Sequence, residues 1–292
     1  MNIKNTQYRI TTDNMSDLSP AFLKEHEVEI VSLSYTIGDE VFNNTNSLTP
    51  KEFFDRMRHG AVPTSSQFNP DDASQMFDRV IEEHDCDIVH ISFSTGMSGC
   101  YGSAVSGAEM TEAKYPGRRV VVIDSLCGSL GQGLLLDKAL QQQKKGASMD
   151  ELISWLERNK RHVCHLLTVE DIIYLYRGGR VSRTAAFVSG VLGIKPMIHV
   201  NDEGRLVPYG KVRGRKKSLF TLLDDMAKHI GNSQNDTFYI THGDCLEDAQ
   251  FMVDQVRERF GITASVIEQV GPTIGAHTGP GLIAIFFMGD YR

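Results

Sequence analysis

The chain has 292 residues, of which 41% are apolar and 23% are charged, and its formal net charge is −7 at pH 7. This length is too great for one small hydrophobic core and suits two medium-sized domains. The acidic balance argues against a surface that covers nucleic acid or an anionic membrane, because both would repel it. The five cysteines form no CxxC pair and have no zinc-ligand spacing, which excludes a zinc ribbon and a disulfide framework.

No segment of the sequence reads as a membrane or export signal. The N-terminal stretch MNIKNTQYRITTD lacks an apolar signal-peptide core. The longest apolar run, 282–288, is far shorter than the roughly 20 residues that cross a bilayer. We therefore expect a soluble, cytoplasmic protein without membrane insertion.

Short β-rich stretches alternate with amphipathic helical stretches through the first half of the chain. The predicted strands are 8–12, 29–36, 87–93 and 119–124. The predicted helices are 16–26, 49–58, 72–84, 104–115, 133–145 and 149–160. A Ser-Pro or Thr-Pro pair, typical of a helix start, opens the first two helices at Ser19 and Thr49. This alternation predicts a parallel sheet flanked by helices.

The pattern changes near residue 162. The predicted strands are 164–169, 196–200, 205–209, 237–241, 264–270 and 281–288, and the predicted helices are 217–229 and 247–259. The Asn-Asp-Glu-Gly stretch at 201–204 reads as a hairpin turn. Hairpins mixed with helices predict an α+β domain with a mixed sheet, so we expect an α/β domain at 1–162 and an α+β domain at 163–292.

Three predicted loops combine hydroxyl side chains with glycines: 63–67 (PTSSQ), 94–99 (STGMSG) and 275–281 (GAHTGPG). Ser94 and Thr95 directly follow a predicted strand, and ligands of parallel sheets bind beyond the carboxyl ends of strands. Each loop alone reads as a turn. Three together indicate a site for a small anionic head group, since glycine lets backbone N–H groups approach an anion.

Standard catalytic motifs are absent. The sequence has no P-loop, no complete dinucleotide fingerprint, no nucleophile elbow and no HExxH pair, so neither a cofactor nor a metal is expected. One enzymatic alternative remains open at this stage: Ser94 or Ser98 with His277 as base would make an acyl hydrolase or transferase, because triad partners meet in space.

Two segments are basic, 177–183 and 205–217. They read either as solvated faces or as places that recognise an anion or an acidic partner. Nucleic acid would require interleaved aromatic side chains and a broader positive field, so we expect no nucleic-acid partner.

Seven stretches together resemble the DegV family of bacterial fatty-acid-binding proteins. In family order they are TTDNMSDLS, VPTSSQ, FSTGMSGCYGSA, VVIDSLCGS, YLYRGGRVSR, GIKPMIHVNDEGRLVPYGKVRGRKKSL and GPTIGAHTGPG. The resemblance implies a three-layer α/β/α first domain and a buried tunnel for a long-chain fatty acid. It also implies a binding protein, not an enzyme, that presents the carboxylate to a separate dihydroxyacetone-kinase-like fatty-acid kinase. The acyl phosphate would feed phospholipid synthesis.

Carried over by motif, the residues that bind the carboxylate are Thr64, Ser65, Ser94, Thr95, Arg180, His277 and Thr278. Within the Thr64/Ser65 and Ser94/Thr95 pairs, the contacting hydroxyl is left open. Arg213 matches a position associated with docking of the kinase or with phosphate handling. The sequence departs from the family pattern at Asn14, Phe68 and Cys100, which affects the shape of the local loops.

Overall fold

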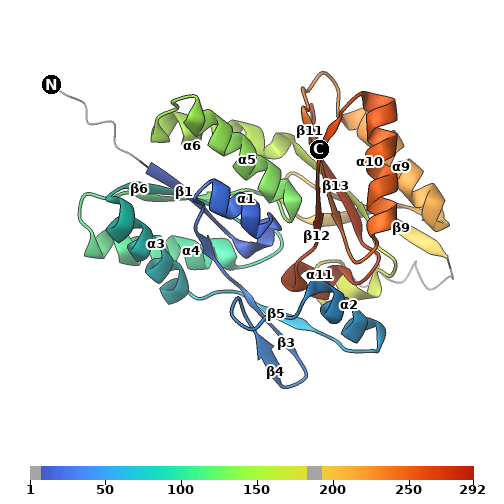
Figure 1. Ribbon diagram of the computed structural model, residues 1–292, viewed down its shortest axis with the longest axis horizontal. Coiled ribbons are helices and arrows are strands. Elements are labelled where there is room, and N and C mark those ends of the chain that lie inside the picture. Colours follow the sequence, from blue (N-terminus) through green and yellow to red (C-terminus); the bar gives the residue numbers. More distant parts are fainter. Residues whose placement is uncertain (1–7, 183–192) are drawn as a thin grey trace.

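The computed structural model describes residues 8–182 and 193–292. Two larger sheets and one small sheet form the framework (Figure 1). The strands of the first larger sheet all precede residue 125, and those of the second all follow residue 162. The predicted α/β class, with a parallel sheet followed by a mixed one, is confirmed.

The first sheet is fully parallel and has the strand order β2-β1-β6-β7. Its strands are β1 (Tyr8–Asp13), β2 (Ile30–Val31), β6 (Asp87–Ser92) and β7 (Val120–Asp124). Its larger helices are α3 (Pro70–His84), α4 (Cys100–Lys114), α5 (Leu130–Lys144) and α6 (Met149–Asn159). In Figure 1, α5 and α6 lie above this sheet and α3 and α4 lie below it, which gives the expected three layers.

The helices of this half begin where the sequence provides caps. Thr49, Asn69 and Ser148 each form a capping box with an acidic residue three positions later, at the starts of α2 (Pro50–Arg58), α3 and α6. Proline occupies the first position of α1 (Pro20–Glu25), α2 and α3, where its missing N–H costs nothing.

The second sheet is mixed and has the order β10-β9-β8-β13-β11-β12. Its strands are β8 (Val163–Thr168), β9 (Ile194–Val200), β10 (Leu206–Arg213), β11 (Thr237–His242), β12 (Ala264–Gln269) and β13 (Ile283–Met288). The hairpin predicted around 201–204 joins β9 to β10. The helices are α7 (Ile173–Arg177), α9 (Arg215–His229), α10 (Leu246–Phe260) and α11 (Pro272–Thr278), and η1 (Asn14–Ser16) and η2 (Lys160–His162) are single 3₁₀ turns. Helix α5 contacts β6 of the first sheet and β8, β11 and β13 of the second, so it lies between the two sheets.

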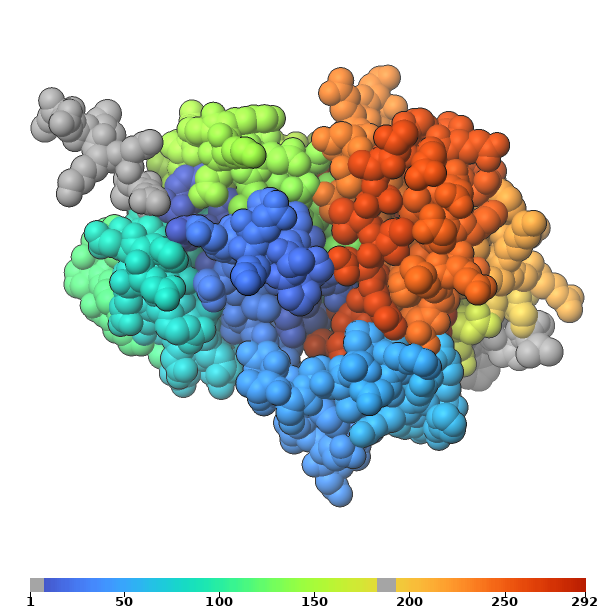
Figure 2. Space-filling view, in the orientation of Figure 1, coloured from blue at the N-terminus to red at the C-terminus, as the bar shows by residue number. Residues whose placement is uncertain are grey.

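A small antiparallel sheet of β3 (Ser34–Ile37), β4 (Glu40–Phe42) and β5 (Thr64–Ser66) protrudes with α2 at the lower edge of the molecule (Figures 1 and 2). The single strand predicted over 29–36 is wrong, because the chain leaves the first sheet after Val31. The side chain of Asn14 binds both backbone groups of Leu33, accepting its N–H at 3.0 Å and donating to its carbonyl at 3.4 Å. Leu33 therefore has no strand partner, and the chain continues into a different sheet.

Two of the three predicted glycine–hydroxyl loops are regular structure. Residues 64–66 form β5, with Ser65 paired to Tyr35 of β3. Residues 275–278 form the last turn of α11, which Pro272 opens. The helix ends at Gly279, where φ is +73° and a Cβ would lie 2.4 Å from the Tyr174 ring. Of the first basic segment, Arg183 lies outside the described residues.

Candidate functional site

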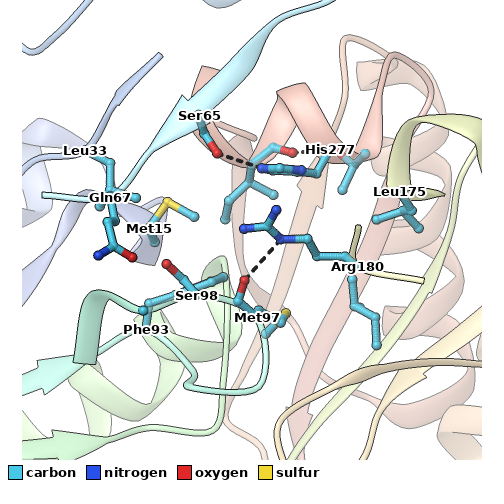
Figure 3. Close-up of a pocket in the computed structure, with 14 residues that line it drawn as sticks. Met15, Leu33, Ser65, Gln67, Phe93, Met97, Ser98, Leu175, Arg180 and His277 are labelled. Atoms are coloured by element: carbon cyan, nitrogen blue, oxygen red, sulfur yellow. Dashed lines mark hydrogen bonds between the residues drawn. The ribbon is translucent and has the colours of Figure 1, made fainter. Parts of the chain in front are cut away.

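A cavity of about 290 Å³ opens where the small sheet, the loop after β6, the turn after α7 and helix α11 meet (Figure 3). We call it the outer cavity. Its lining residues are Met15, Leu33, Ser65, Gln67, Phe93, Met97, Ser98, Gly99, Leu175, Arg180, Leu206, Ile274, His277 and Thr278. Polar side chains from four separate segments thus face one space.

A second, smaller cavity of about 60 Å³ shares Phe93, Met97, Leu206, Ile274 and Thr278 with the outer cavity. We call it the inner cavity. Its other lining residues are Gly128, Ser129, His165, Leu167, Val200, Leu282, Ala284 and Phe286. Its accessible wall is entirely apolar, because Ser129 and His165 direct their polar atoms to other protein groups. The outer cavity therefore combines polar groups with apolar ones, and the inner cavity that adjoins it has an apolar accessible wall.

Ser65 and His277 join the two halves of the chain at this site. Ser65 Oγ on β5 and His277 Nε2 on α11 form a hydrogen bond of 2.7 Å (Figure 3). The imidazole packs against Gly178 at the end of α7, where a Cβ would lie 2.0 Å from Nδ1. Burial, together with the nearby Arg180 charge, lowers the pKa of His277 to about 4, so the ring is neutral at pH 7.

Arg180 brings a positive charge into the outer cavity. Its Nε donates to the Met97 carbonyl at 3.1 Å, Nη1 donates to the Gly178 carbonyl, and the guanidinium points between Ser98 and His277 (Figure 3). Burial lowers the pKa of Arg180, but an arginine stays charged at neutral pH. Within 8–182 and 193–292, no carboxylate forms an ion pair with it. The cavity wall thus holds a cation for which the described residues provide no counter-ion.

Four of the seven residues proposed for carboxylate binding line the outer cavity, namely Ser65, Arg180, His277 and Thr278. They lie far apart in the sequence and the fold brings them together. The hydroxyl of Thr278 donates to the Ile274 carbonyl at 3.3 Å, a bond within its own helix.

The other three residues do not line either cavity, and each hydroxyl is engaged elsewhere. Thr64 Oγ1 lies 2.6 Å from Thr36 Oγ1 on the exposed face of the small sheet. Ser94 is fully buried and donates to the Gly204 carbonyl at 2.8 Å. Thr95 Oγ1 donates to the Asp124 carboxylate at 2.5 Å. Ser94 thus fixes the β9–β10 turn against the loop after β6.

Two polar lining residues were not predicted as ligands of an anion. Gln67 lies two positions after Ser65, and this spacing, typical of one strand face, was the available signal. Ser98 lies in the turn after β6, with Oγ 3.0 Å from Cys100 Sγ. Ser98 belongs to the predicted anion-binding loop 94–99, but its individual role was expected to be that of a nucleophile.

The Ser–His pairs that the hydrolase alternative requires are wrong. His277 bonds Ser65, whereas Ser94 donates to Gly204 and Ser98 lies against Cys100. Nδ1 of His277 has no hydrogen-bond partner in the described part of the chain, so no acid orients the ring as in a triad.

Residues 8–182 and 193–292 contain no cluster of three or more histidine, cysteine or acidic side chains that could hold a metal ion. None of the helices described here is both long and apolar enough to cross a membrane.

Arg213 ends strand β10, paired with Ile194, and is exposed outside both cavities. Exposed lysines accompany it at 211, 216 and 217. The second basic segment is therefore in part a solvent-facing positive patch.

A model of the DegV family, described as uncharacterised proteins, matches residues 7–290. A DegV domain-containing protein of Clostridium perfringens is 38% identical over 288 residues, which cover 98% of this chain and 99% of the relative. Another from Lactococcus lactis is 30% identical and covers 96% of each chain.

Solved structures of similar proteins match nearly the whole length of this chain. A stearic-acid-binding protein of Eubacterium ventriosum superposes with a TM-score of 0.89 at 26% identity, covering 98% of this chain and 99% of that one. A fatty-acid-binding DegV protein of Thermus thermophilus gives 0.85 at 27% identity, covering 97% and 99%. DegV of Bacillus subtilis, described as a fatty-acid-binding protein, gives 0.81 at 26% identity, covering 98% and 100%. All three are described by the ligand they bind and not as enzymes. With a family match that spans almost every residue, the chain belongs to the DegV family.

Proposed function

We propose that this protein binds a long-chain fatty acid, with the carboxylate at the polar groups of the outer cavity and the hydrocarbon tail running from the outer cavity into the inner cavity. The observation that carries this proposal is the Arg180 guanidinium, which has no counter-ion within the described residues and is bonded to Met97, a residue that lines both cavities. A fatty acid meets both conditions, because its carboxylate can pair with the guanidinium and its hydrocarbon tail can occupy the apolar cavity. The fatty-acid-binding relatives support the same ligand class.

The head group would be held by hydroxyls and one imidazole in addition to Arg180. When Nε2 of the neutral His277 carries the proton, it donates to Ser65 Oγ, and Ser65 then donates its own hydrogen to the carboxylate. Ser98, Gln67 and Thr278 face the same space. Each hydrogen bond to a charged acceptor contributes about 1.5–3 kcal/mol. We therefore propose Ser65, Ser98, Gln67, Arg180, His277 and Thr278 as the head-group site, in place of Thr64, Ser94 and Thr95.

The tail would supply most of the affinity. Burial of one methylene contributes about 0.8 kcal/mol, so about fourteen methylenes contribute on the order of 10 kcal/mol before ordering costs. Met97 lies at the junction of the two cavities, and its unbranched side chain can change rotamer to widen the passage. The loops around the head group then set the orientation of the acid.

We further propose that the bound carboxylate is presented to a separate fatty-acid kinase, which would convert it to an acyl phosphate for phospholipid synthesis in the cytoplasm. The resemblance described above supports this role. The exposed patch at Arg213 supports it too, because a positive patch on an acidic protein suits an acidic partner. A domain boundary at 162/163 is supported by the position of the strands, since the four-stranded sheet uses only strands before residue 125 and the six-stranded sheet only strands after residue 162.

The test begins with protein purified from bacteria, extracted with organic solvent and analysed by mass spectrometry for long-chain acids. Delipidated protein is then titrated with palmitate. Arg180→Met should weaken binding roughly 10- to 100-fold, because it removes the charge and keeps the apolar stem. Arg177→Met, at an exposed arginine three residues earlier, is the matched control and should bind as wild type does. Empty protein that also ignores added palmitate would refute the proposal.

A further inference from the structure

The guanidinium of Arg292 lies at a junction of three chain segments and is bonded to all of them. Nε donates to the Val163 carbonyl at 2.9 Å. Nη1 donates to the carbonyls of Leu126 at 2.9 Å and Asn201 at 3.1 Å. Nη2 donates to the Lys160 carbonyl at 2.5 Å and to Cys127 Sγ at 3.1 Å. All three nitrogens are thus engaged, and none of these partners within the described ranges is a carboxylate.

Each of the three segments continues directly into a wall of the inner cavity. Leu126 and Cys127 precede the lining residues Gly128 and Ser129. Val163 lies two residues before His165. Asn201 follows Val200 at the end of β9. The three walls come from the first sheet's last loop, from β8 and from the β9–β10 hairpin, so they belong to both halves of the chain.

The backbone at this junction is not relaxed. Leu126 has φ of +53° and Ser129 has φ of +54°, conformations that non-glycine residues rarely adopt and that persist only when the surroundings enforce them. The Leu126 carbonyl accepts from Arg292, and the Ser129 hydroxyl donates to the Asp17 carboxylate at 2.6 Å. The loop that forms one wall of the inner cavity is therefore held in place from outside the cavity.

We propose that Arg292 is a positioning residue that fixes the inner end of the acyl channel and thereby sets how the affinity depends on chain length. This inference rests on the proposed fatty-acid function. A planar guanidinium reaches acceptors in several directions at once, whereas an ammonium has one nitrogen and cannot span the same three segments. Without the guanidinium, the carbonyls that face it lose their donor and the three walls separate.

The consequence is confined to acids whose tails reach the inner cavity. In a well-packed channel each additional methylene raises the affinity about fourfold, which is 0.8 kcal/mol. In Arg292→Ala, the methylenes that enter the inner cavity should add less than twofold each. The affinity of a 10-carbon acid, whose tail is the shortest in the series, should stay within about threefold of wild type.

The experiment measures dissociation constants of saturated acids of 10, 12, 14, 16 and 18 carbons for the delipidated full chain. The variants are Arg292→Ala, Arg292→Lys and the control Arg257→Ala, which removes an exposed arginine that lies 3.7 Å from Asp254. The control should reproduce the wild-type rise of affinity with chain length. Both Arg292 variants should flatten this rise for the longer acids, and millimolar methylguanidinium should restore it in Arg292→Ala.

An unchanged rise in the Arg292 variants would overturn the inference. Equal weakening for all five acids without rescue by methylguanidinium would also overturn it, because such loss reports general destabilisation. Arg292→Lys covers the case in which the alanine variant does not fold. Failure of the proposed function is seen separately, since wild type would then bind none of the acids.

Discussion

Gly178→Ala isolates the contribution of His277 to ligand binding without touching any polar atom. The backbone at Gly178 is right-handed helical, with φ of −73° and ψ of −6°, so alanine adopts it without strain. The new Cβ would lie 2.0 Å from His277 Nδ1, 2.9 Å from Cε1 and 3.1 Å from Cγ. Because such contacts do not occur below 3.0 Å, the imidazole must move by about 1 Å or more.

A displacement of this size breaks the 2.7 Å bond between Ser65 and His277, because hydrogen bonds fail beyond about 3.5 Å. Ser65 then loses the His277 N–H that orients its hydroxyl, and loss of the hydrogen bond from Ser65 to the carboxylate weakens palmitate binding roughly 10- to 150-fold. Titration calorimetry on delipidated protein measures this change, and urea unfolding checks that the free energy of unfolding is retained. Gly102→Ala, in open space on α4, is the control and should bind as wild type does. Wild-type affinity in Gly178→Ala would refute the reasoning.

Ser94→Ala should lower the free energy of unfolding by about 1–3 kcal/mol, because the buried Gly204 carbonyl loses its donor, and should leave palmitate affinity unchanged. Ser65→Ala should show the reverse pattern in the same urea and calorimetric assays. Ala284→Leu should fill the inner cavity and weaken binding of a 16-carbon acid at least tenfold more than that of a 10-carbon acid in parallel titrations. Burial lowers the pKa of His90 from 6.5 to about 3, so between pH 5.5 and 4.5 only the unfolded chain binds this proton, and stability falls with acid. His90→Gln should reduce that fall by about 1.4 kcal/mol per pH unit in urea titrations; an unchanged slope would contradict the assignment.

Local sequence signals were sufficient for the longer helices and the β9–β10 hairpin, but not for the short helices α7 and α11. A capping residue followed by proline fixes the start of α2 at Pro50 because all participating groups lie within one turn. The turn at 201–204 is likewise local, since Asn201 Oδ1 accepts the Arg205 N–H and Gly204 has a positive φ. In these elements the interacting groups are neighbours in the sequence.

The remaining features depend on partners that are distant in the sequence. Leu33 leaves the sheet because of Asn14, and the polar segment 64–66 becomes a strand only because β3 pairs with it. Ser94 and Ser98 are chemically equivalent in the sequence. Gly204, 110 residues away, engages the first, whereas the second faces the outer cavity. No spacing rule within one loop can report such a choice.

The outer and inner cavities lie at the interface between the two halves of the molecule. Ser65 and Phe93 come from one half and His277 and Phe286 from the other, so neither half encloses the space alone. A ligand bound there contacts both halves and therefore stabilises the folded chain. The gain in the free energy of unfolding grows with the ratio of the ligand concentration to its dissociation constant. The melting temperature and the rate of proteolysis therefore report whether a ligand is bound. In hybrid proteins that take one half from a relative, ligand binding should be lost first, because the cavities are lined by residues of both halves.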